Sequence, residues 1–217
     1  VFSIDELEEK LPSLLADSET FYYQMGLYPD WDTRMLSLLR IAQRQARFGK
    51  KVPRTIVEPG TLVHEMRLLK TPEEVEFMRK ACEITAQAHK RIMSVTRPGV
   101  MEYQLEALLQ YHFRGNGCTE AAYNSIVGGG ANAAILHYVE NQDMLRDGDI
   151  VLIDAGAEYA YYAGDITRSF PVNGKFSPQQ RDIYQLVLEA EEAAIAVCAP
   201  GVRFREIHAT ASRRLTE

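Results

Sequence analysis

Cysteine is scarce in this chain of 217 residues. There are three cysteines, Cys82, Cys118 and Cys198, which lie far apart in the sequence and lack Cys-x-x-Cys spacing. An odd number at such distances argues against a framework of disulfides. We therefore expect three buried free thiols in a reducing, cytoplasmic compartment.

Long apolar runs and dense blocks of one charge are also missing. No apolar run approaches the length of a transmembrane helix, and the chain does not open with the pattern of a secretory signal peptide. The formal net charge is −6, and lysine and arginine are not clustered. These features argue against a nucleic acid or a membrane as the main partner.

The first part of the chain has the pattern of a small piece of α/β structure. Ser3 and Glu6 form a capping-box signature for a first helix. The expected elements are a helix at 5–15, a strand at 21–23, a helix from Asp32 to about Phe48, a strand at 55–57 and a turn at Glu58-Pro59-Gly60. So short a set would fold poorly alone. We therefore expect residues 1–67 to be the end of a separate domain.

The second part, residues 68–217, opens on a strong helix signal. In Thr71-Pro72-Glu73-Glu74, threonine can cap the helix, proline suits its first position and two acids lie at the positive end of the helix dipole. The expected helices span 72–97, 102–113 and 178–199, with a fourth from about Phe204. The expected strands span 121–127, 133–138, 150–153 and 161–170. The composition of elements is therefore α+β.

The last two of these strands each carry or adjoin an aspartate. Ile150–Ile153 is apolar and β-branched, and Asp154 follows on the face of Ile150 and Leu152. The second run, Tyr161–Phe170, contains Asp165. If the two runs form a hairpin centred between Tyr159 and Ala160, the aspartates stand directly opposite each other with Cβ atoms about 4.5–5.5 Å apart.

Two buried, facing carboxylates need a cation between them, or one of them must stay protonated. The alternative is that each aspartate caps a turn, as aspartate often does. That alternative is favoured for Asp154 alone. For the pair, both embedded in strand-like runs, a metal site is favoured. Carboxylate oxygens suit Mn or Mg and, with an added imidazole, Zn or Co.

Several segments together resemble the bacterial Xaa-Pro aminopeptidases (aminopeptidase P). These belong to the pita-bread metallopeptidases of family M24, whose other members include prolidase, methionine aminopeptidase and creatinase. The segments are Val63–Leu68, Tyr123–Gly130, Ile135–Tyr138, Ile153–Gly156, Tyr162–Pro171 and Asn173–Phe176. The combination spans most of the chain after about Leu62 and is far more specific than any one segment.

The resemblance implies a fold, a reaction and a cofactor. Residues 68–217 would be the first half of a pita-bread domain, a curved antiparallel sheet covered by helix pairs. Residues 1–67 would end a creatinase-like α/β domain. The activity would be hydrolysis of the bond between an N-terminal residue and a following proline, through a hydroxide that bridges two Mn²⁺ ions, with Co²⁺ or Zn²⁺ as alternatives. Asp154 would hold one metal and Asp165 would bridge both.

Among the five histidines, His137 is the candidate site residue. On the residue pattern alone, His137 shares a predicted strand face with Ala133 and Ile135, and a packed core histidine is favoured. The match of Ile135–Tyr138 reverses that preference, because it places His137 at the family's substrate-binding or proton-relaying histidine. Gly128-Gly129-Gly130 lacks the lysine and helix start of a phosphate loop, so we expect a flexible turn there.

The resemblance also bears on what these residues can do alone. The family's other metal ligands, a histidine and two glutamates, would lie beyond Glu217, so we expect an internal piece that is inactive by itself. The complete protein would be a homo-oligomer, a dimer or tetramer, acting on peptides with proline second. A prolidase- or creatinase-type hydrolase and a non-catalytic pita-bread binding module remain as alternatives.

Overall fold

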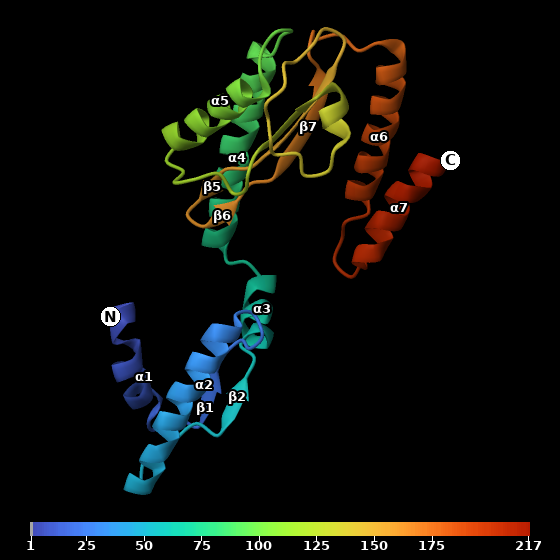
Figure 1. The fold of residues 1–217 in the computed structure, drawn as a ribbon. Coiled ribbons are helices and arrows are strands. Elements are labelled where there is room, and N and C mark those ends of the chain that lie inside the picture. The colour runs from blue at the N-terminus through green and yellow to red at the C-terminus, as the bar shows by residue number, and fades with distance from the viewer. Residues whose placement is uncertain (1) are drawn as a thin grey trace. The chain divides into compact units, whose positions relative to one another are not determined.

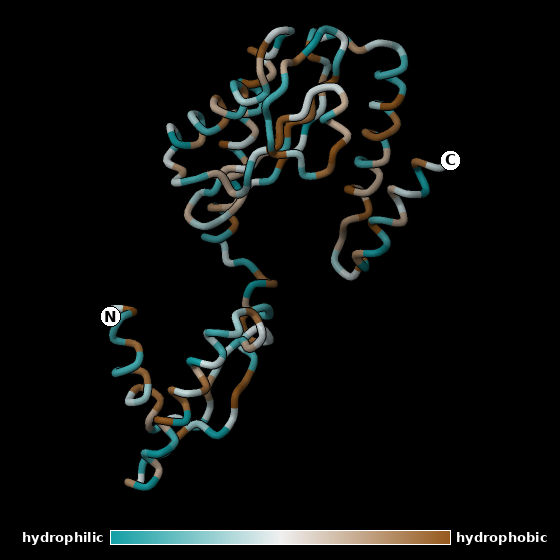
Figure 2. The backbone as a smooth tube through the Cα atoms, viewed as in Figure 1, coloured by the Kyte–Doolittle hydropathy of each residue, from teal (hydrophilic) through white to brown (hydrophobic). Residues whose placement is uncertain are grey.

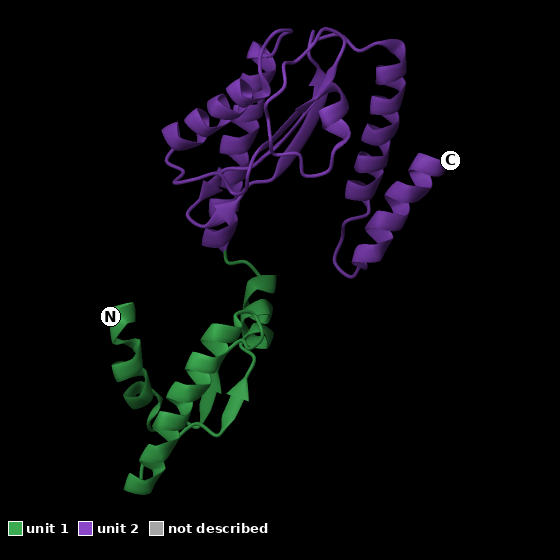
Figure 3. Ribbon diagram, viewed as in Figure 1, with its two compact units in different colours: residues 1–71 green, residues 72–217 purple. Residues whose placement is uncertain are grey.

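The computed structural model describes residues 2–217, and its contacts divide the chain into two compact units, residues 1–71 and residues 72–217 (Figure 3). Each unit has its own buried apolar cluster. The assignment of residues 1–67 to a creatinase-like domain stays a prediction.

The smaller unit is a helical layer on a two-stranded parallel sheet (Figure 1). Its elements are η1 (Ile4–Glu6), α1 (Leu7–Leu15), β1 (Thr20–Tyr22), α2 (Pro29–Arg44), η2 (Gln45–Phe48), β2 (Thr55–Val57) and α3 (Gly60–Leu68). Leu15, Leu39 and Ala42 form its buried cluster. The parallel pairing of β1 with β2 is typical of α/β structure.

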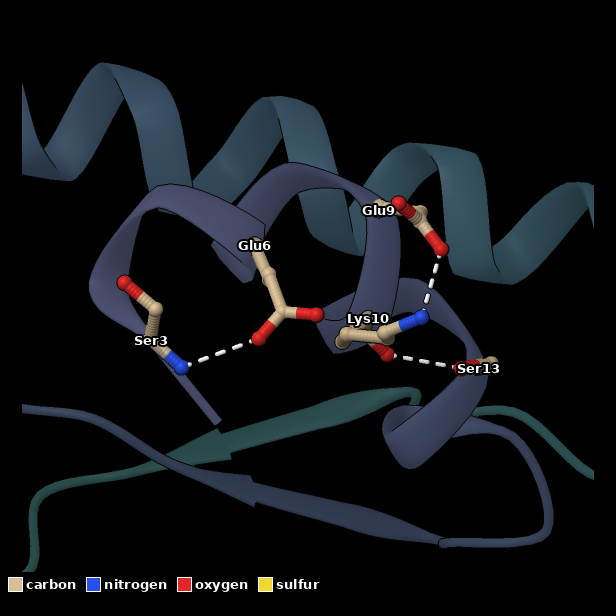
Figure 4. Close-up of polar contacts among 5 residues, drawn as sticks. All are labelled: Ser3, Glu6, Glu9, Lys10 and Ser13. Carbon is tan, nitrogen blue, oxygen red and sulfur yellow. Dashed lines mark hydrogen bonds and ion pairs between the residues drawn. The ribbon is translucent and has the colours of Figure 1, made fainter. Parts of the chain in front are cut away.

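Local signals in this unit predicted most of its elements. The expected capping box is present, since the Ser3 backbone N–H donates to the Glu6 carboxylate at 3.0 Å (Figure 4). The second α-helix ends at Arg44, but the 3-10 helix η2 continues it to Phe48, and the helical segment stops near the predicted position at Gly49, whose φ of 80° suits glycine. One prediction was incomplete: the turn at Glu58-Pro59-Gly60 leads directly into α3, a helix that the sequence pattern did not predict.

The larger unit packs helices on a three-stranded antiparallel sheet. It contains α4 (Pro72–Val95), α5 (Glu102–Gly115), β3 (Ile126–Gly129), η3 (Gly130–Ala134), β4 (Ile150–Ala155), β5 (Glu158–Tyr159), β6 (Tyr162–Ala163), β7 (Ile166–Pro171), α6 (Pro178–Ala196) and α7 (Phe204–Thr216). The strand order in this sheet is β3-β4-β7. The short strands β5 and β6 pair with each other in a separate two-stranded antiparallel sheet. This mixture of elements confirms the predicted α+β class.

The core of the larger unit lies between one face of this sheet and the helices α4 and α5. Val151, Ile153 and Ala155 alternate along β4 with side chains that face the other way, and all three are fully buried. They pack with residues of both helices: Ile84, Ala88, Ile92, Leu105, Leu109 and Phe113. Figure 2 shows the apolar colouring of these central strands.

The opposite face of the sheet is only partly covered. Ile150, Leu152 and Asp154 lie on it at intermediate exposure. A groove of about 1010 Å³ runs between this face and α6, and its apolar lining includes Ile150, Ile183 and Val187. Ser177 caps α6 as predicted, accepting from the Gln180 backbone N–H at 3.2 Å.

Two strand predictions were wrong. Of the predicted strand at 121–127 only Ile126 and Val127 are strand residues, because β3 begins at Ile126 and runs on to Gly129. Residues 133–138 form no strand, since η3 and a turn occupy this region. Gly128 and Gly129 are strand residues rather than a flexible turn. A Cβ on Gly128 would lie 2.9 Å from the backbone carbonyl of Asn132, so the close approach of these two backbone segments favours glycine there.

The burial of the cysteines and the hydropathy of the helices can be compared with the sequence. Cys118 is buried, but Cys82 and Cys198 are exposed, so the prediction of three buried thiols was right for one of them. Burial raises the pKa of the Cys118 thiol. No helix among the described residues is long and apolar enough to cross a membrane.

Candidate metal and active site

The two aspartates lie on a long hairpin whose turn is formed by Ala160 and Tyr161. Both residues have positive φ, 50° and 68°, and Tyr159 pairs with Tyr162. Two consecutive residues of positive φ are typical of the type I′ turn, which usually selects Asn-Gly or Asp-Gly. Because the sequence carries no such signal here, the predicted turn centre was wrong by one residue.

This difference changes the pairing of the aspartates. Asp154 pairs with Thr167, not with Asp165, and Asp165 lies between β6 and β7. The predicted direct opposition was therefore wrong. Thr167 shares a face with Asp154, since directly paired residues point to the same side of a sheet.

A single hydroxyl nevertheless joins the two carboxylates. The Tyr123 hydroxyl lies 2.5 Å from Asp154 Oδ1 and 2.9 Å from Asp165 Oδ1. Burial, reinforced by the hydrogen bonds to Asp154 and Asp165, strongly raises the pKa of Tyr123. The phenol therefore stays protonated at neutral pH. The residue pattern around Tyr123 does not predict this role, although Tyr123 opens one of the segments that carry the family resemblance.

The carboxylates are less buried than predicted: Asp154 is half-buried and Asp165 is exposed. The reason is that α4 and α5 cover only the other face of the sheet. Two hard oxygen donors that converge on one point fit a divalent cation, but they are too few to complete its coordination. Accordingly, no group of three or more His, Cys, Asp or Glu side chains within residues 2–217 could hold a metal ion.

Close backbone contacts hold the aspartate hairpin in place. A Cβ on Gly156 would lie 1.8 Å from the Gly164 carbonyl oxygen, so only glycine permits this approach. Thr85 of α4 anchors the same region, because its hydroxyl accepts from the Ala157 backbone N–H at 3.0 Å and donates to the Ala81 carbonyl at 2.8 Å. Asp154 and Asp165 each lie next to or near this anchored crossing in the sequence.

The structure places His137 in a turn rather than on a strand. Its φ is 57°, in the left-handed region, and its side chain is exposed. The prediction of a strand face shared with Ala133 and Ile135 was therefore wrong, as was the packed core position. Backbone hydrogen bonds from the Ile135 N–H to the Asn132 carbonyl at 3.0 Å and from the Tyr138 N–H to the Ile135 carbonyl at 3.4 Å form this turn, and the local sequence pattern does not predict it.

Another histidine is buried directly behind the aspartate strands. His89 on α4 is 3% exposed, and neither ring nitrogen has a hydrogen-bond partner among the described residues. Burial lowers the pKa of His89. His89 is thus packed in the core as a residue of the buried face of α4.

Comparison with known proteins identifies the family. Residues 76–217 match the model described as Metallopeptidase family M24. The Xaa-Pro aminopeptidase of Escherichia coli (strain K12) is 45% identical over 205 residues, which cover 94% of this chain and 46% of that protein. The Xaa-Pro aminopeptidase of Haemophilus influenzae is 43% identical over 200 residues, covering 92% and 44%. The chain thus spans about half the length of the curated relatives it matches.

Solved structures agree with the sequence match. Pseudomonas aeruginosa aminopeptidase PepP superposes with a TM-score of 0.93 at 46% identity, over 99% of this chain and 49% of that one. A variant of Escherichia coli aminopeptidase P in complex with substrate gives a TM-score of 0.92 at 43% identity, over 99% and 49%. On this evidence, the chain belongs to metallopeptidase family M24.

Proposed function

We propose that the full-length gene product is an Xaa-Pro aminopeptidase, which hydrolyses the bond between an N-terminal residue and a following proline. The observation that carries the proposal is the convergence of Asp154 and Asp165 on the Tyr123 hydroxyl, in a chain of family M24. The Escherichia coli relative solved with substrate supports the same reaction class.

Asp154 would hold one divalent metal and Asp165 would bridge two, with Mn²⁺ as the proposed metal and Co²⁺ or Zn²⁺ as alternatives. A Zn-substituted Escherichia coli relative supports this range. Such a metal pair, when bound, acidifies water and polarises the scissile carbonyl. The remaining ligands would come from a region that the matched relatives have and these 217 residues do not include.

The residues of this chain would organise the site around the cation. Tyr123 would hold the two carboxylates together through its shared hydroxyl. His137 would contact the substrate near the scissile bond or relay a proton, as its exposure permits. Neither role needs His137 to be a metal ligand.

The wider predictions belong to the same proposal. Residues 68–217 would form the first half of a pita-bread domain, whose second half would cover the partly exposed sheet face. The complete protein would be a cytoplasmic homo-oligomer. Three substrates would separate these activities. A longer peptide with proline second tests for aminopeptidase activity, a dipeptide that ends in proline tests for prolidase-type activity, and creatine tests for creatinase-type activity.

The sharpest test of the site is His137→Ala in the full-length gene product. Turnover should fall by about a hundredfold or more, the typical contribution of a group that transfers a proton. Metal content, measured on the same sample, should stay near that of the wild type. Loss of metal with unchanged turnover per bound metal would show that His137 is a ligand or a packing residue instead.

A further inference from the structure

The loop that carries His137 is long and largely irregular. It runs from the end of β3 at Gly129 to the start of β4 at Ile150, and its regular structure is confined to the short η3. Loops of this length in compact domains are commonly functional and need specific anchors. The structure shows what anchors this one.

The principal anchor is the carboxylate of Glu102, the first residue of α5, which is fully buried. Each of its oxygens accepts two hydrogen bonds. The donors are Gly129 N at 2.8 Å and Asn132 Nδ2 at 3.2 Å to Oε1, and Tyr138 Oη at 2.8 Å and Asp143 N at 2.9 Å to Oε2. One carboxylate thus ties together loop positions on both sides of His137.

A second anchor is the side chain of Asn141 in the loop, which reaches Glu106, one turn along α5 from Glu102. The buried Asn141 side chain accepts from the Val127 backbone N–H at 2.9 Å and donates to the Ser125 carbonyl at 2.8 Å. It also donates to Glu106 at 3.0 Å. Hydrogen bonds of Glu102 and Asn141 therefore attach the loop to both α5 and β3.

Burying a carboxylate is costly unless its hydrogen-bonding capacity is satisfied, and an apolar residue would fill the same space at lower cost. The four donors and the positive end of the α5 dipole offset that cost for Glu102. What the carboxylate adds over an apolar residue is a fixed position for each donor. It specifies the loop conformation.

We propose that Glu102 is a positioning residue that holds His137 in its working geometry. His137 adopts a left-handed backbone conformation that non-glycine residues rarely take. Its immediate neighbour Tyr138 and the upstream Asn132 are both fixed by Glu102 and by each other, through a 3.0 Å hydrogen bond. The inference that Glu102 positions His137 rests on the proposed function of His137. The hydrogen bonds by which Glu102 fixes the loop are independent of that function.

The test compares Glu102→Gln with Glu140→Gln in the full-length gene product loaded with Mn²⁺. An amide nitrogen at either Glu102 oxygen would face two donors, whereas Glu140 is an exposed residue of the same loop, bonded to the neighbouring Val139 N–H. Hydrogen exchange of residues 130–143 should accelerate about tenfold to a hundredfold in Glu102→Gln. Its kcat should fall with little change in KM, and the control should match the wild type.

Two further variants keep the inference falsifiable. In a His137→Ala background, Glu102→Gln should lower kcat no further, because Glu102 acts through His137; an additive loss would contradict the proposal. Should Glu102→Gln not fold, Tyr138→Phe removes one donor and gives the same comparison. Unchanged loop exchange in either variant would overturn the role of Glu102. An inactive wild type would instead overturn the proposed function, and the exchange data would still decide whether Glu102 fixes the loop.

Discussion

Two carboxylate clusters in the larger unit have opposite environments. Glu102 is fully buried and accepts four hydrogen bonds from neutral donors. Asp154 and Asp165 are half-buried and exposed, and within residues 2–217 they share one donor, the Tyr123 hydroxyl. The hydrogen-bonding capacity of Glu102 is fully used, whereas Asp154 and Asp165 each keep oxygen lone pairs that no described donor uses.

The difference shows how hydrogen-bond accounting separates structural from functional carboxylates. A carboxylate whose lone pairs are all used internally can fix a conformation but cannot bind a cation without breaking those bonds. A pair with spare lone pairs and mutual repulsion gains from a cation. The comparison therefore predicts that a substitution at Glu102 acts mainly on the loop conformation, whereas a substitution at the aspartate pair acts mainly on metal binding.

The largest effect should come from Asp165→Asn in the full-length gene product. Loss of a bridging carboxylate should lower kcat/KM roughly a thousandfold, since metal-ion catalysis supplies several kcal/mol. The fold should be retained, because Asp165 is exposed. The matched substitution Glu102→Gln should reduce activity less while loosening the loop. Similar activities for wild type and Asp165→Asn, measured on a proline-second peptide, would contradict the account.

A pair of tyrosine substitutions should give the next largest effects. Tyr138→Phe removes one of four donors to Glu102 and should cost about 1.5–3 kcal/mol of stability, the range for a bond to a charged group, without changing metal affinity. Tyr123→Phe removes the donor shared by the aspartates and should weaken metal binding about tenfold to a hundredfold. Urea denaturation would measure the loss of stability, and Mn²⁺ titration would measure the loss of metal affinity. A loss of metal affinity in Tyr138→Phe with none in Tyr123→Phe would contradict our assignment of the two clusters.

A smaller effect is expected from His89, a buried group that belongs to neither cluster. Because burial lowers its folded-state pKa, with Arg168 adding to this and Asp154 opposing it, the unfolded chain binds a proton first as pH falls. Stability should be full above the unfolded pKa near 6.5 and decline as pH drops through the folded pKa, by at most about 1.4 kcal/mol per pH unit. His89→Leu should flatten this dependence in denaturation between pH 5 and 8. An unchanged slope would exclude His89 as its source.

The sequence predicted elements whose signals are local. Helix starts at Ser3 and Ser177 follow from capping chemistry, and the aspartate strands follow from short apolar runs. The hairpin turn could not be predicted, because Ala160 and Tyr161 carry no preference for positive φ. The pairing of Asp154 with Thr167 follows from that turn, so the error in register had a single cause.

The site was predictable only in part for a related reason. Asp154 and Asp165 are distinctive as a pair, and the family resemblance marked His137. The contributions of Tyr123 and Glu102 depend on contacts between residues about 30 to 40 positions apart in sequence. No periodicity or spacing encodes such contacts, and a glutamate at the start of a helix is ordinarily interpreted as a favourable charge at the helix dipole.

Thermal unfolding with and without Mn²⁺ tests the central claim most directly. Full-length wild type, Asp165→Asn and Glu102→Gln would be melted in chelator and at increasing Mn²⁺. Wild type and Glu102→Gln should gain stability with metal, by about 2.7 kcal/mol at a hundred times Kd. Asp165→Asn should gain almost none, although it should be slightly more stable in chelator because one of two repelling charges is gone. Equal metal-induced shifts in wild type and Asp165→Asn would contradict the assignment of the aspartate pair as a metal site.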